Sequence, residues 1–218
     1  MLVADDDAAG GEVRTFSAVA RSPINVPGPR ELRGQWEVAT RVSSAALTLG
    51  DASALTKMLV RADPDGALAA VLPVLGRADR AGDVLRVGSG PGEWLLLSSF
   101  EEAHAVAESI WAVADPGLVS VVDLTHGRAL VRLSGADAAR ALAKVCAVDL
   151  ADTKAPDGTA FRGSVASLTT DVVRDDRDGT RSYLLHCERS SGQFLFEALL
   201  EAGNEFGIEP VGLAGREI

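Results

Sequence analysis

The sequence predicts an α+β fold in which one β-β-α-β-β-α unit occurs twice and the two copies are related by a pseudo-twofold axis. Short apolar runs separated by Gly/Pro turns alternate with runs of helical spacing. Similar stretches also recur about seventy residues apart along the chain. Because one copy alone could not cover its own sheet, the two copies are expected to share a core.

The N-terminal part of the chain differs from the rest. The segment "RSPINVPGPRELRG" (residues 21–34) holds three prolines and two glycines, which exclude a regular helix or a central strand. Residues 1–44 are therefore expected to form an extended arm that docks on another surface. Residues 45–218 are expected to form the duplicated domain, with halves at about 45–115 and 118–206 and a C-terminal tail.

The first half begins with "AALTLGDASALTKMLVRA" (residues 45–62), which predicts a strand that is broken near Asp51-x-Ser53. Asp63 and Pro64 then predict the start of a short helix that ends at Pro73. The runs "GDVLRVGSG" and "GEWLLLSS" flank a Gly/Pro turn and predict a hairpin.

A longer helix is expected to close the first half. Ser99 and Glu102 have the spacing of a capping box at its start. Its apolar face is expected to consist of Phe100, Ala103, Ala107, Ile110 and Trp111.

The second half repeats this order. "VSVVDLTHGRALVRLSG" (residues 119–135) predicts strand, and Ser134 with Asp137 predicts a capping box before the next helix. Two further strands are expected on either side of a turn at residues 177–179, and Ser190 with Gln193 predicts another capped helix. The Val-Arg dipeptides at residues 60–61 and 131–132 are expected to be equivalent positions of the two copies.

Composition and charge exclude several classes of protein. Hydrophobic residues make up 47% of the chain and charged residues 24%, as in ordinary globular domains. The formal net charge of −10 argues against a nucleic-acid surface. No segment has the length of a membrane span, and the acidic N-terminus is unlike a signal peptide, so a cytoplasmic protein is expected. Cys146 and Cys187 are expected to be buried thiols.

Asp123, Thr125 and His126 form the cluster of the sequence with the most side chains able to act in acid-base chemistry or ligand binding. These residues have three interpretations: catalysis by an acid-base pair, contact with a ligand or partner, and hydrogen bonding to the backbone at a strand bend. The first half has Asp51-x-Ser53 at the matching place without a histidine, which favours the structural interpretation.

Other candidate motifs are weaker. "GSGPGE" precedes a strand where a dinucleotide loop would precede a helix, so a turn is expected. His104 and His186 lack partners at metal-ligand spacing. Neither a catalytic constellation nor a metal site is predicted.

Five stretches together resemble the γ subunit of heterotetrameric sarcosine oxidase and cover about residues 45–203. They are "LGDASALTKMLVRA", "GPGEWLLLSS", "VVDLTHGRALVRLSGADAARALAKVCAVDL", "GTAFRGSVASL" and "SYLLHCERSSGQFLFEALLEAG". That subunit is in the fold group of the folate-binding part of the glycine-cleavage aminomethyltransferase, or T-protein. The resemblance implies a complex that oxidatively demethylates sarcosine and passes the one-carbon unit to tetrahydrofolate.

The resemblance also implies how the cofactors are divided among the subunits. FAD, FMN, NAD and tetrahydrofolate are expected in the larger flavin- and dinucleotide-binding partner subunits of a heterotetramer, and no cofactor is expected on this chain alone. The aminomethyltransferases use an acidic residue after a Gly-Gly turn, and "FRGSVASLTTDVV" lacks that turn. A non-catalytic γ-like subunit is therefore the first hypothesis.

Two alternatives stay open. A self-sufficient, tetrahydrofolate-dependent aminomethyltransferase or demethylase would use Arg61, Arg128 and Arg132 to receive an anionic glutamate tail. A stand-alone scaffold of the same fold would use the proline-rich arm to bind its partner.

Overall fold

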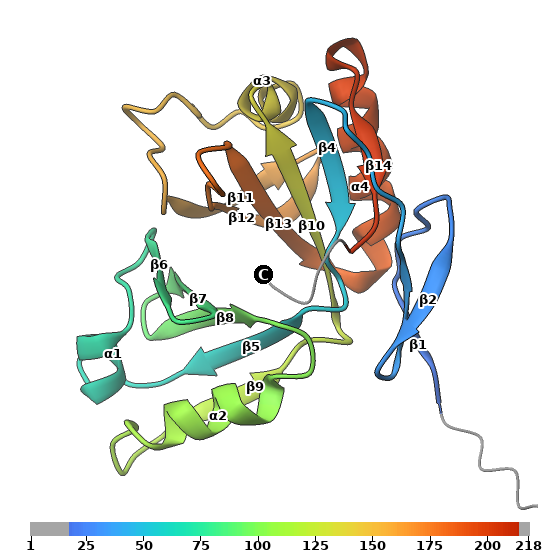
Figure 1. Cartoon of the computed structure of the whole chain (residues 1–218). Coiled ribbons are helices and arrows are strands. Elements are labelled where there is room, and N and C mark those ends of the chain that lie inside the picture. The colour runs from blue at the N-terminus through green and yellow to red at the C-terminus, as the bar shows by residue number, and fades with distance from the viewer. Residues whose placement is uncertain (1–17, 214–218) are drawn as a thin grey trace, which may run out of the picture.

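The computed structural model describes residues 18–213 and confirms the α+β class (Figure 1). Within this range two large sheets face each other, and helices cover their outer faces. A small third sheet is formed by the N-terminal arm. No helix in the described range is long and apolar enough to cross a membrane. The acidic N-terminal cluster considered above lies outside the described residues.

The elements follow one another in the order strand, strand, helix, three strands, helix in each half. The strands are β1 (Ala20–Arg21), β2 (Arg30–Arg33), β3 (Trp36–Ala39), β4 (Leu47–Asp51), β5 (Thr56–Arg61), β6 (Ala78–Ala81), β7 (Val84–Gly90), β8 (Glu93–Ser98), β9 (Ser120–Asp123), β10 (Arg128–Gly135), β11 (Ala160–Val165), β12 (Leu168–Arg174), β13 (Ser182–Glu188) and β14 (Glu209–Val211). The helices are α1 (Ala67–Val71), α2 (Ala103–Trp111), α3 (Ala138–Ala143), α4 (Gly192–Gly203) and the 3-10 helices η1 (Arg189–Ser191) and η2 (Asn204–Phe206).

The two halves exchange their first strands. The five-stranded sheet has the order β6-β7-β8-β5-β9, and the six-stranded sheet has the order β11-β12-β13-β10-β4-β14. β4 of the first half therefore completes the sheet of the second half, and β9 of the second half completes the sheet of the first. Apart from β14 the two orders are the same, which is the pseudo-twofold relation expected from the repeat.

The repeat unit contains one strand more than the sequence pattern indicated. In the second half the run of residues 159–176 turns at Ala166 and Ser167, both with positive φ, and forms the β11-β12 hairpin. The equivalent first-half pair is β6 and β7. The prediction that the two Val-Arg dipeptides are equivalent is wrong. Met58 pairs with Asp123 in the five-stranded sheet, and Val131 pairs with Asp51 in the six-stranded sheet. Val131 therefore corresponds to Met58 and not to Val60.

The predicted capping boxes are wrong. α2, α3 and α4 have Glu102, Asp137 and Ser191 as N-cap residues, and none of these caps makes a side-chain hydrogen bond. The apolar face predicted for α2 is correct for Ala103, Ala107 and Ile110, which pack in one core, whereas Trp111 is 54% exposed. Trp111 is the last residue of α2.

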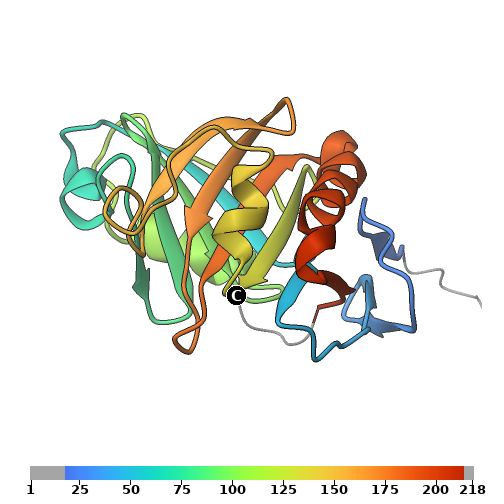
Figure 2. The same ribbon diagram turned by 90° about the horizontal axis from the view of Figure 1, so that it is seen from above.

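The arm contains regular structure and packs on its own chain. β2 and β3 form a hairpin, and β1 pairs in parallel with β3. Ile24 and Val26 are buried in the core of the second half, and the backbone N–H of Asn25 donates to the Gln193 side chain at 2.7 Å. Seen from above, the arm lies beside α4, on the side away from the first half (Figure 2).

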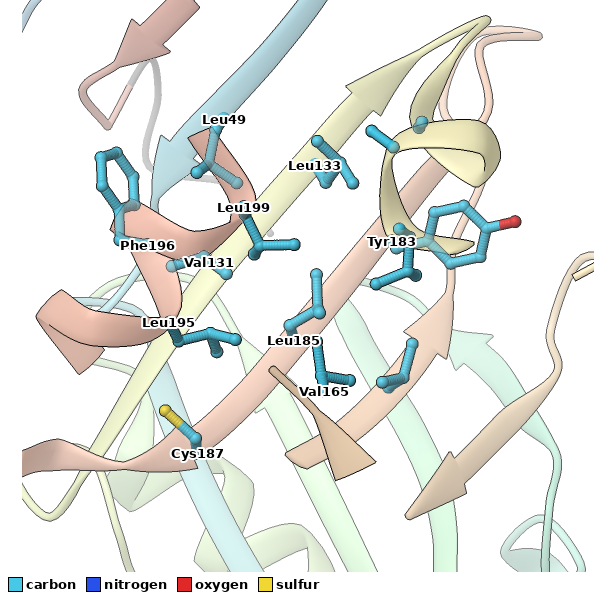
Figure 3. Close-up of a cluster of buried hydrophobic side chains, with 14 of the residues drawn as sticks. Leu49, Val131, Leu133, Val165, Tyr183, Leu185, Cys187, Leu195, Phe196 and Leu199 are labelled. Carbon is cyan, nitrogen blue, oxygen red and sulfur yellow. The ribbon is translucent and has the colours of Figure 1, made fainter. Parts of the chain in front are cut away.

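The outer core of the second half lies between the six-stranded sheet and α3 with α4. Residues of β4, β10 and β13 that point away from the first half pack against α4 (Figure 3). The main contributors are Leu49, Val131, Leu133, Tyr183, Leu185, Cys187, Leu195, Phe196 and Leu199. Cys187 is a buried free thiol, as is Cys146, and burial raises the pKa of Cys187 to about 11.

A second core lies between the two sheets. Leu130, Val173 and Leu184 of the six-stranded sheet pack with Leu95 and Leu97 of the five-stranded sheet. On the strands β10, β12 and β13 the residues at either end of this apolar band are polar. The inter-sheet layer is therefore apolar in the middle and charged at both ends, and these two ends are where chemistry can occur.

Candidate functional site

Asp123 and Thr125 build a strand bend. Asp123 Oδ1 accepts the backbone N–H of Thr125 at 2.7 Å, and Thr125 Oγ1 accepts the backbone N–H of Lys57 at 3.1 Å. In the other half, Asp51 Oδ1 accepts the N–H of Ser53 at 3.0 Å, and Ser53 Oγ accepts the N–H of Leu130 at 3.2 Å. The same polar pair thus stabilises both points at which a strand crosses from one sheet to the other.

His126 stacks on Trp36, with ring centroids 4.7 Å apart. Together with Asp123, Thr125 and Glu101 these two rings line an open hollow of about 270 Å³ at the junction of the arm and the first half. No bond between the Asp123 carboxylate and the His126 ring is present among the described contacts, so the geometry does not assemble an acid-base pair.

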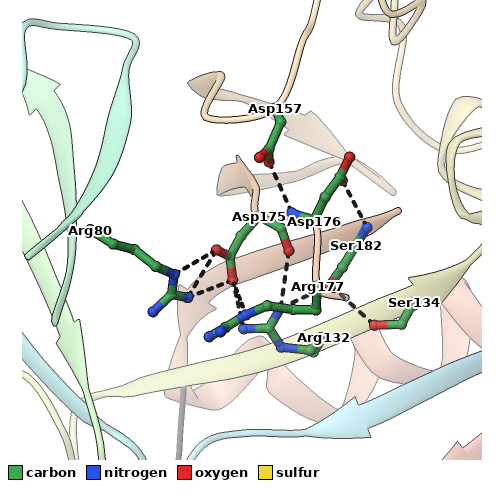
Figure 4. Close-up of polar contacts among 8 residues, drawn as sticks. All are labelled: Arg80, Arg132, Ser134, Asp157, Asp175, Asp176, Arg177 and Ser182. Atoms are coloured by element: carbon green, nitrogen blue, oxygen red, sulfur yellow. Dashed lines mark hydrogen bonds and ion pairs between the residues drawn. The ribbon is translucent and has the colours of Figure 1, made fainter. Parts of the chain in front are cut away.

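Arg132 lies at one charged end of the inter-sheet layer, away from the other two predicted arginines. Its Nη2 donates to Asp175 at 2.9 Å, and Arg80 and Arg177 donate to the same carboxylate at 2.8 Å and 3.1 Å (Figure 4). Burial alone would raise the pKa of Asp175, but Arg132 and Arg80 outweigh it and hold the pKa below its ordinary value. Because Arg80 comes from β6, this cluster joins the two sheets.

Arg61 and Arg128 lie at the opposite charged end. They line a crevice of about 200 Å³ between the two sheets. Its apolar wall consists of Leu59, Leu95 and Leu124. This crevice is the candidate functional site, because it combines a concave surface with a group of buried titratable side chains.

A chain of ion pairs crosses the crevice from sheet to sheet. Arg61 pairs with Glu93 at 2.8 Å, and Arg162 reaches Glu93 at 3.4 Å and Asp171 at 2.6 Å. His186 Nδ1 lies 3.3 Å from Asp171 Oδ2. At the mouth, Arg128 and Glu188 form a further pair at 2.7 Å.

Asp171 and His186 are both strongly shielded from solvent, with side chains 14% and 5% exposed. Burial alone would raise the pKa of Asp171, but the bonds from His186 and Arg162 outweigh it, so the pKa is lowered and the group is a carboxylate. Burial lowers the pKa of His186, against the opposing effect of Asp171. At neutral pH the pair is therefore a carboxylate beside a neutral imidazole.

Sequence patterns did not select Asp171, His186, Arg162 or Glu93. A signal for two of them was present: the Asp178-Gly179 dipeptide forms a two-residue turn with positive φ at both residues. That turn sets the register of β12 and β13, in which Asp171 stands directly opposite His186. The participation of Arg61 and Glu93 depends on the packing of the two sheets, which no local pattern encodes.

The residues of the crevice do not fit the large groups that the resemblance associates with such complexes. A volume of about 200 Å³ is below the ~300–1,000 Å³ that encloses drug-sized ligands. "GSGPGE" forms the end of β7 and the turn into β8, where a dinucleotide site needs a helix N-terminus. Among the described residues no group of three or more His, Cys, Asp or Glu is arranged to hold a metal ion.

The fold is similar to two solved structures. One chain of the heterotetrameric sarcosine oxidase from Corynebacterium sp. U-96 matches with a TM-score of 0.65 at 23% identity, covering 83% of this chain and 91% of that chain. Aminomethyltransferase T of the glycine cleavage system from Bartonella henselae matches with a TM-score of 0.66 at 18% identity, covering 86% of this chain and 56% of that one.

Two curated aminomethyltransferases are similar to this chain in sequence. An aminomethyltransferase of Geobacillus thermodenitrificans is 32% identical over 137 residues, which are 62% of this chain and 36% of the relative. An aminomethyltransferase of Anoxybacillus flavithermus is 33% identical over 101 residues, 46% of this chain and 28% of the relative. The matched segments span about a third of the length of these curated relatives.

The model of the GCVT N-terminal domain matches residues 81–218, more than half of the chain. These residues hold β7 to β14 and α2 to α4, including the crevice residues Glu93, Arg128, Arg162, Asp171 and His186. On this match the chain belongs to the GCVT N-terminal domain family.

Proposed function

We propose that this chain is a non-catalytic, γ-like subunit of a sarcosine oxidase-type complex, which oxidatively demethylates sarcosine and passes the one-carbon unit to tetrahydrofolate. The proposal rests on how much of each matched chain is covered by the fold comparison. The fold match extends over 91% of one chain of a heterotetrameric sarcosine oxidase, against 56% of aminomethyltransferase T. The described fold is thus about as extensive as a subunit of a heterotetramer.

The chemistry of the crevice supports a non-catalytic role. Glu93, Asp171 and Glu188 are each held in an ion pair with an arginine. For Asp171 the bonds from His186 and Arg162 outweigh burial and lower the pKa, so this carboxylate is a weak general base. The partner subunits would then carry the flavins, the dinucleotide and tetrahydrofolate.

Co-purification tests the proposal. The chain is tagged and expressed alone and together with the proteins encoded beside it. The expected result is a complex with visible flavin absorbance that forms hydrogen peroxide from sarcosine, while the chain alone forms none. Failure to recover any flavoprotein with the tagged chain would remove the proposal.

The second candidate is a self-sufficient tetrahydrofolate-dependent aminomethyltransferase or demethylase, in which Arg61, Arg128 and Arg162 around one crevice would receive only the anionic glutamate tail. Calorimetry with tetrahydrofolate on the isolated chain distinguishes the two. Tight binding at a ratio of one to one would support the enzyme, and heat that does not saturate would support the subunit.

A further inference from the structure

Strand β9 forms one edge of the five-stranded sheet (Figure 1), and it pairs only with β5. The N–H of Leu124 donates to the carbonyl oxygen of Lys57 at 2.8 Å. Because bonded and non-bonded pairs alternate along antiparallel strands, the backbone of Val122 also bonds to β5. The N–H and C=O groups of Val121 and Asp123 then point outward, and no hydrogen bond to them occurs among the described residues.

The other edges of the two large sheets are each met by backbone from elsewhere in the chain. At β6 the N–H of Ala78 donates to the carbonyl oxygen of Gly158 at 2.7 Å, and at β11 the N–H of Ala160 donates to that of Gly76 at 3.0 Å. The residue after β14 donates its N–H to the carbonyl oxygen of Arg41 at 2.8 Å. Native sheets protect open edges with lysine, proline or a bulge. The sequence of β9, SVVD, has neither residue, and its pairing with β5 has no bulge.

The other half of the fold shows what covers the equivalent edge. β4 is the counterpart of β9, and β14 pairs with it in parallel, with Pro210 opposite Leu49. Because Asp123 corresponds to Asp51, Val121 corresponds to Leu49, two residues earlier. No described strand takes the place of β14 on β9, since the chain that leaves α2 enters β9 itself. The edge of β9 therefore has the geometry that accepts one added parallel strand.

Apolar side chains are exposed beside this edge. Leu118, two residues before β9, is 93% exposed, and Val122 is 43% exposed. Leu118 and Ser120 also line an open hollow of about 510 Å³ next to the start of the strand. An extended segment on β9 would remove these side chains from water, which favours its association.

The surface around β9 is acidic. Residues 87–127 contain neither lysine nor arginine, and their carboxylates are those of Glu93, Glu101, Glu102, Glu108, Asp115 and Asp123. Asp115 and Asp123 are exposed near the two ends of β9, and their described bonds are to backbone N–H groups. Two copies of this chain joined at β9 would bring like charges together, whereas lysine or arginine on an added segment would neutralise them.

We propose that β9 accepts an extended, basic segment of a partner protein as a sixth, parallel strand of the five-stranded sheet. The backbone of Val121 and Asp123 bonds to the segment, and an apolar side chain of the segment covers Val122. Lysine or arginine at its ends pairs with Asp115 and Asp123. This surface deepens the subunit role proposed above and rests on it for the partner that supplies the segment.

The experiment uses the full chain and a set of synthetic peptides. The first peptide alternates valine and threonine and has lysines at both ends. The second has glutamate in place of each lysine, and the third is the first with N-methyl groups on its central amides, which removes the donors that strand addition needs. Binding is measured by fluorescence anisotropy and by the backbone amide resonances of the chain.

The basic peptide is expected to bind and to shift the amide resonances of Val121 and Asp123 more than that of Val122, whose N–H already bonds to β5. The acidic and the N-methylated peptides are each expected to bind about tenfold or more weakly. A nitroxide at the N-terminus of the basic peptide should broaden the resonance of Ser120 and not that of His126, because a parallel strand begins at the Ser120 end of β9.

A proline variant tests the edge from the side of the chain. Val121→Pro removes an outward N–H and no bond to β5, so it is expected to weaken binding of the basic peptide about tenfold. The matched control is Val42→Pro, at a 78% exposed valine before β4, which should leave binding unchanged. Circular dichroism checks that both variants are folded.

Three outcomes would overturn the proposal, and none depends on the folding of a variant. One is that the basic peptide leaves the Val121 and Asp123 resonances of the unmodified chain unchanged. Another is that the acidic or the N-methylated peptide binds as well as the basic one. The third is a dimer of the chain alone in which the Val121 amide is protected from hydrogen exchange, since a second copy would then cover the edge. Peptide binding is measured without any flavoprotein, so the subunit role is tested separately.

Discussion

Lys57 places an amine where the other half of the fold has an apolar side chain. The backbone N–H of Lys57 donates to Thr125 Oγ1, and the backbone N–H of Leu130 donates to Ser53 Oγ in the other half. Lys57 and Leu130 are therefore equivalent positions of the two halves. Lys57 is fully buried, and its Nζ donates to the carbonyl oxygens of Ser53 and Leu55 at 2.7 Å each. Burial lowers its pKa to about 7, against the attraction of Asp51 and Asp123.

This amine predicts a rise in stability with pH. The pKa is about 7 in the folded chain and about 10.4 in the unfolded chain. Between these values the unfolded chain binds a proton that the folded chain has released, so the free energy of unfolding increases with pH. From pH 7 to 8.5 the expected gain is about 1–2 kcal/mol.

Urea unfolding of Lys57→Met at the two pH values measures this gain. The variant should lack it, whereas Lys154→Met, which replaces an exposed lysine, should keep it. An equal pH dependence in all three proteins would show that Lys57 is protonated in the folded chain at pH 8.5.

At the scale of elements, the helix starts are determined by tertiary contacts. The Asp115 carboxylate, from the loop before β9, accepts the N–H of Ala67 at the first residue of α1 at 2.6 Å. The serines with capping-box spacing make no such bond. Spacing alone could not distinguish these cases, because the cap of α1 lies 48 positions away along the chain.

Substitutions at these positions should follow the contacts. Asp115→Ala is expected to lower the free energy of unfolding by about 1 kcal/mol, the contribution of an N-terminal cap. Ser99→Ala and Ser190→Ala are expected to change it by less than about 0.5 kcal/mol. Chemical denaturation of the three variants checks this, and a larger loss at either serine would contradict the observed caps.

Gly192 allows the start of α4 to approach β10, with the arm packed beside it. A Cβ at this position would lie 2.6 Å from the Cβ of Ala129 and 3.2 Å from Pro23. Gly192→Ala should therefore destabilise the chain, although alanine favours helix by up to about 1 kcal/mol over glycine. Gly117→Ala, where a Cβ would meet nothing within 4 Å, is the control, and a stabilised Gly192→Ala would mean that the start of α4 does not pack on β10 as described.

At the scale of the whole molecule, the exchange of β4 and β9 makes the two halves interdependent. The Asp175 cluster adds an electrostatic link, since Arg80 of the five-stranded sheet and Arg132 of the six-stranded sheet share one carboxylate that is 6% exposed. The crevice depends on the same relation between the sheets. A substitution that separates the halves is therefore expected to affect the stability of both.

Asp175→Asn tests this link. It leaves three arginines without their shared charge and is expected to cost about 2 kcal/mol at neutral pH, discounted because these arginines are partly exposed. The folded-state pKa of Asp175 is lowered, so its contribution is present above about pH 4 and is lost as the pH falls through the folded value. The difference between the two proteins should disappear in acid; a constant difference would contradict the charge-based account.

The order of elements could be predicted from the sequence, whereas the site could not. Turns such as Asp178-Gly179 and the break after Asp51 are encoded by neighbouring residues. The β11-β12 hairpin was missed because Ala166 and Ser167 adopt positive φ, which glycine usually provides. Among the predicted contacts, Arg61 and Arg128 lie at the crevice, Arg132 lies in the Asp175 cluster, and Asp123 with Thr125 stabilises a strand bend.

The proposed role of this chain as a subunit is tested most directly by the composition of the particle that contains it. The tagged chain, expressed with the proteins encoded beside it, is purified and its mass is measured by light scattering, with each component identified by intact-mass spectrometry. We predict one flavin-containing species in which this chain and three different chains each occur once. A particle that contains this chain alone, beside a complete flavoprotein complex that lacks it, would contradict the claim.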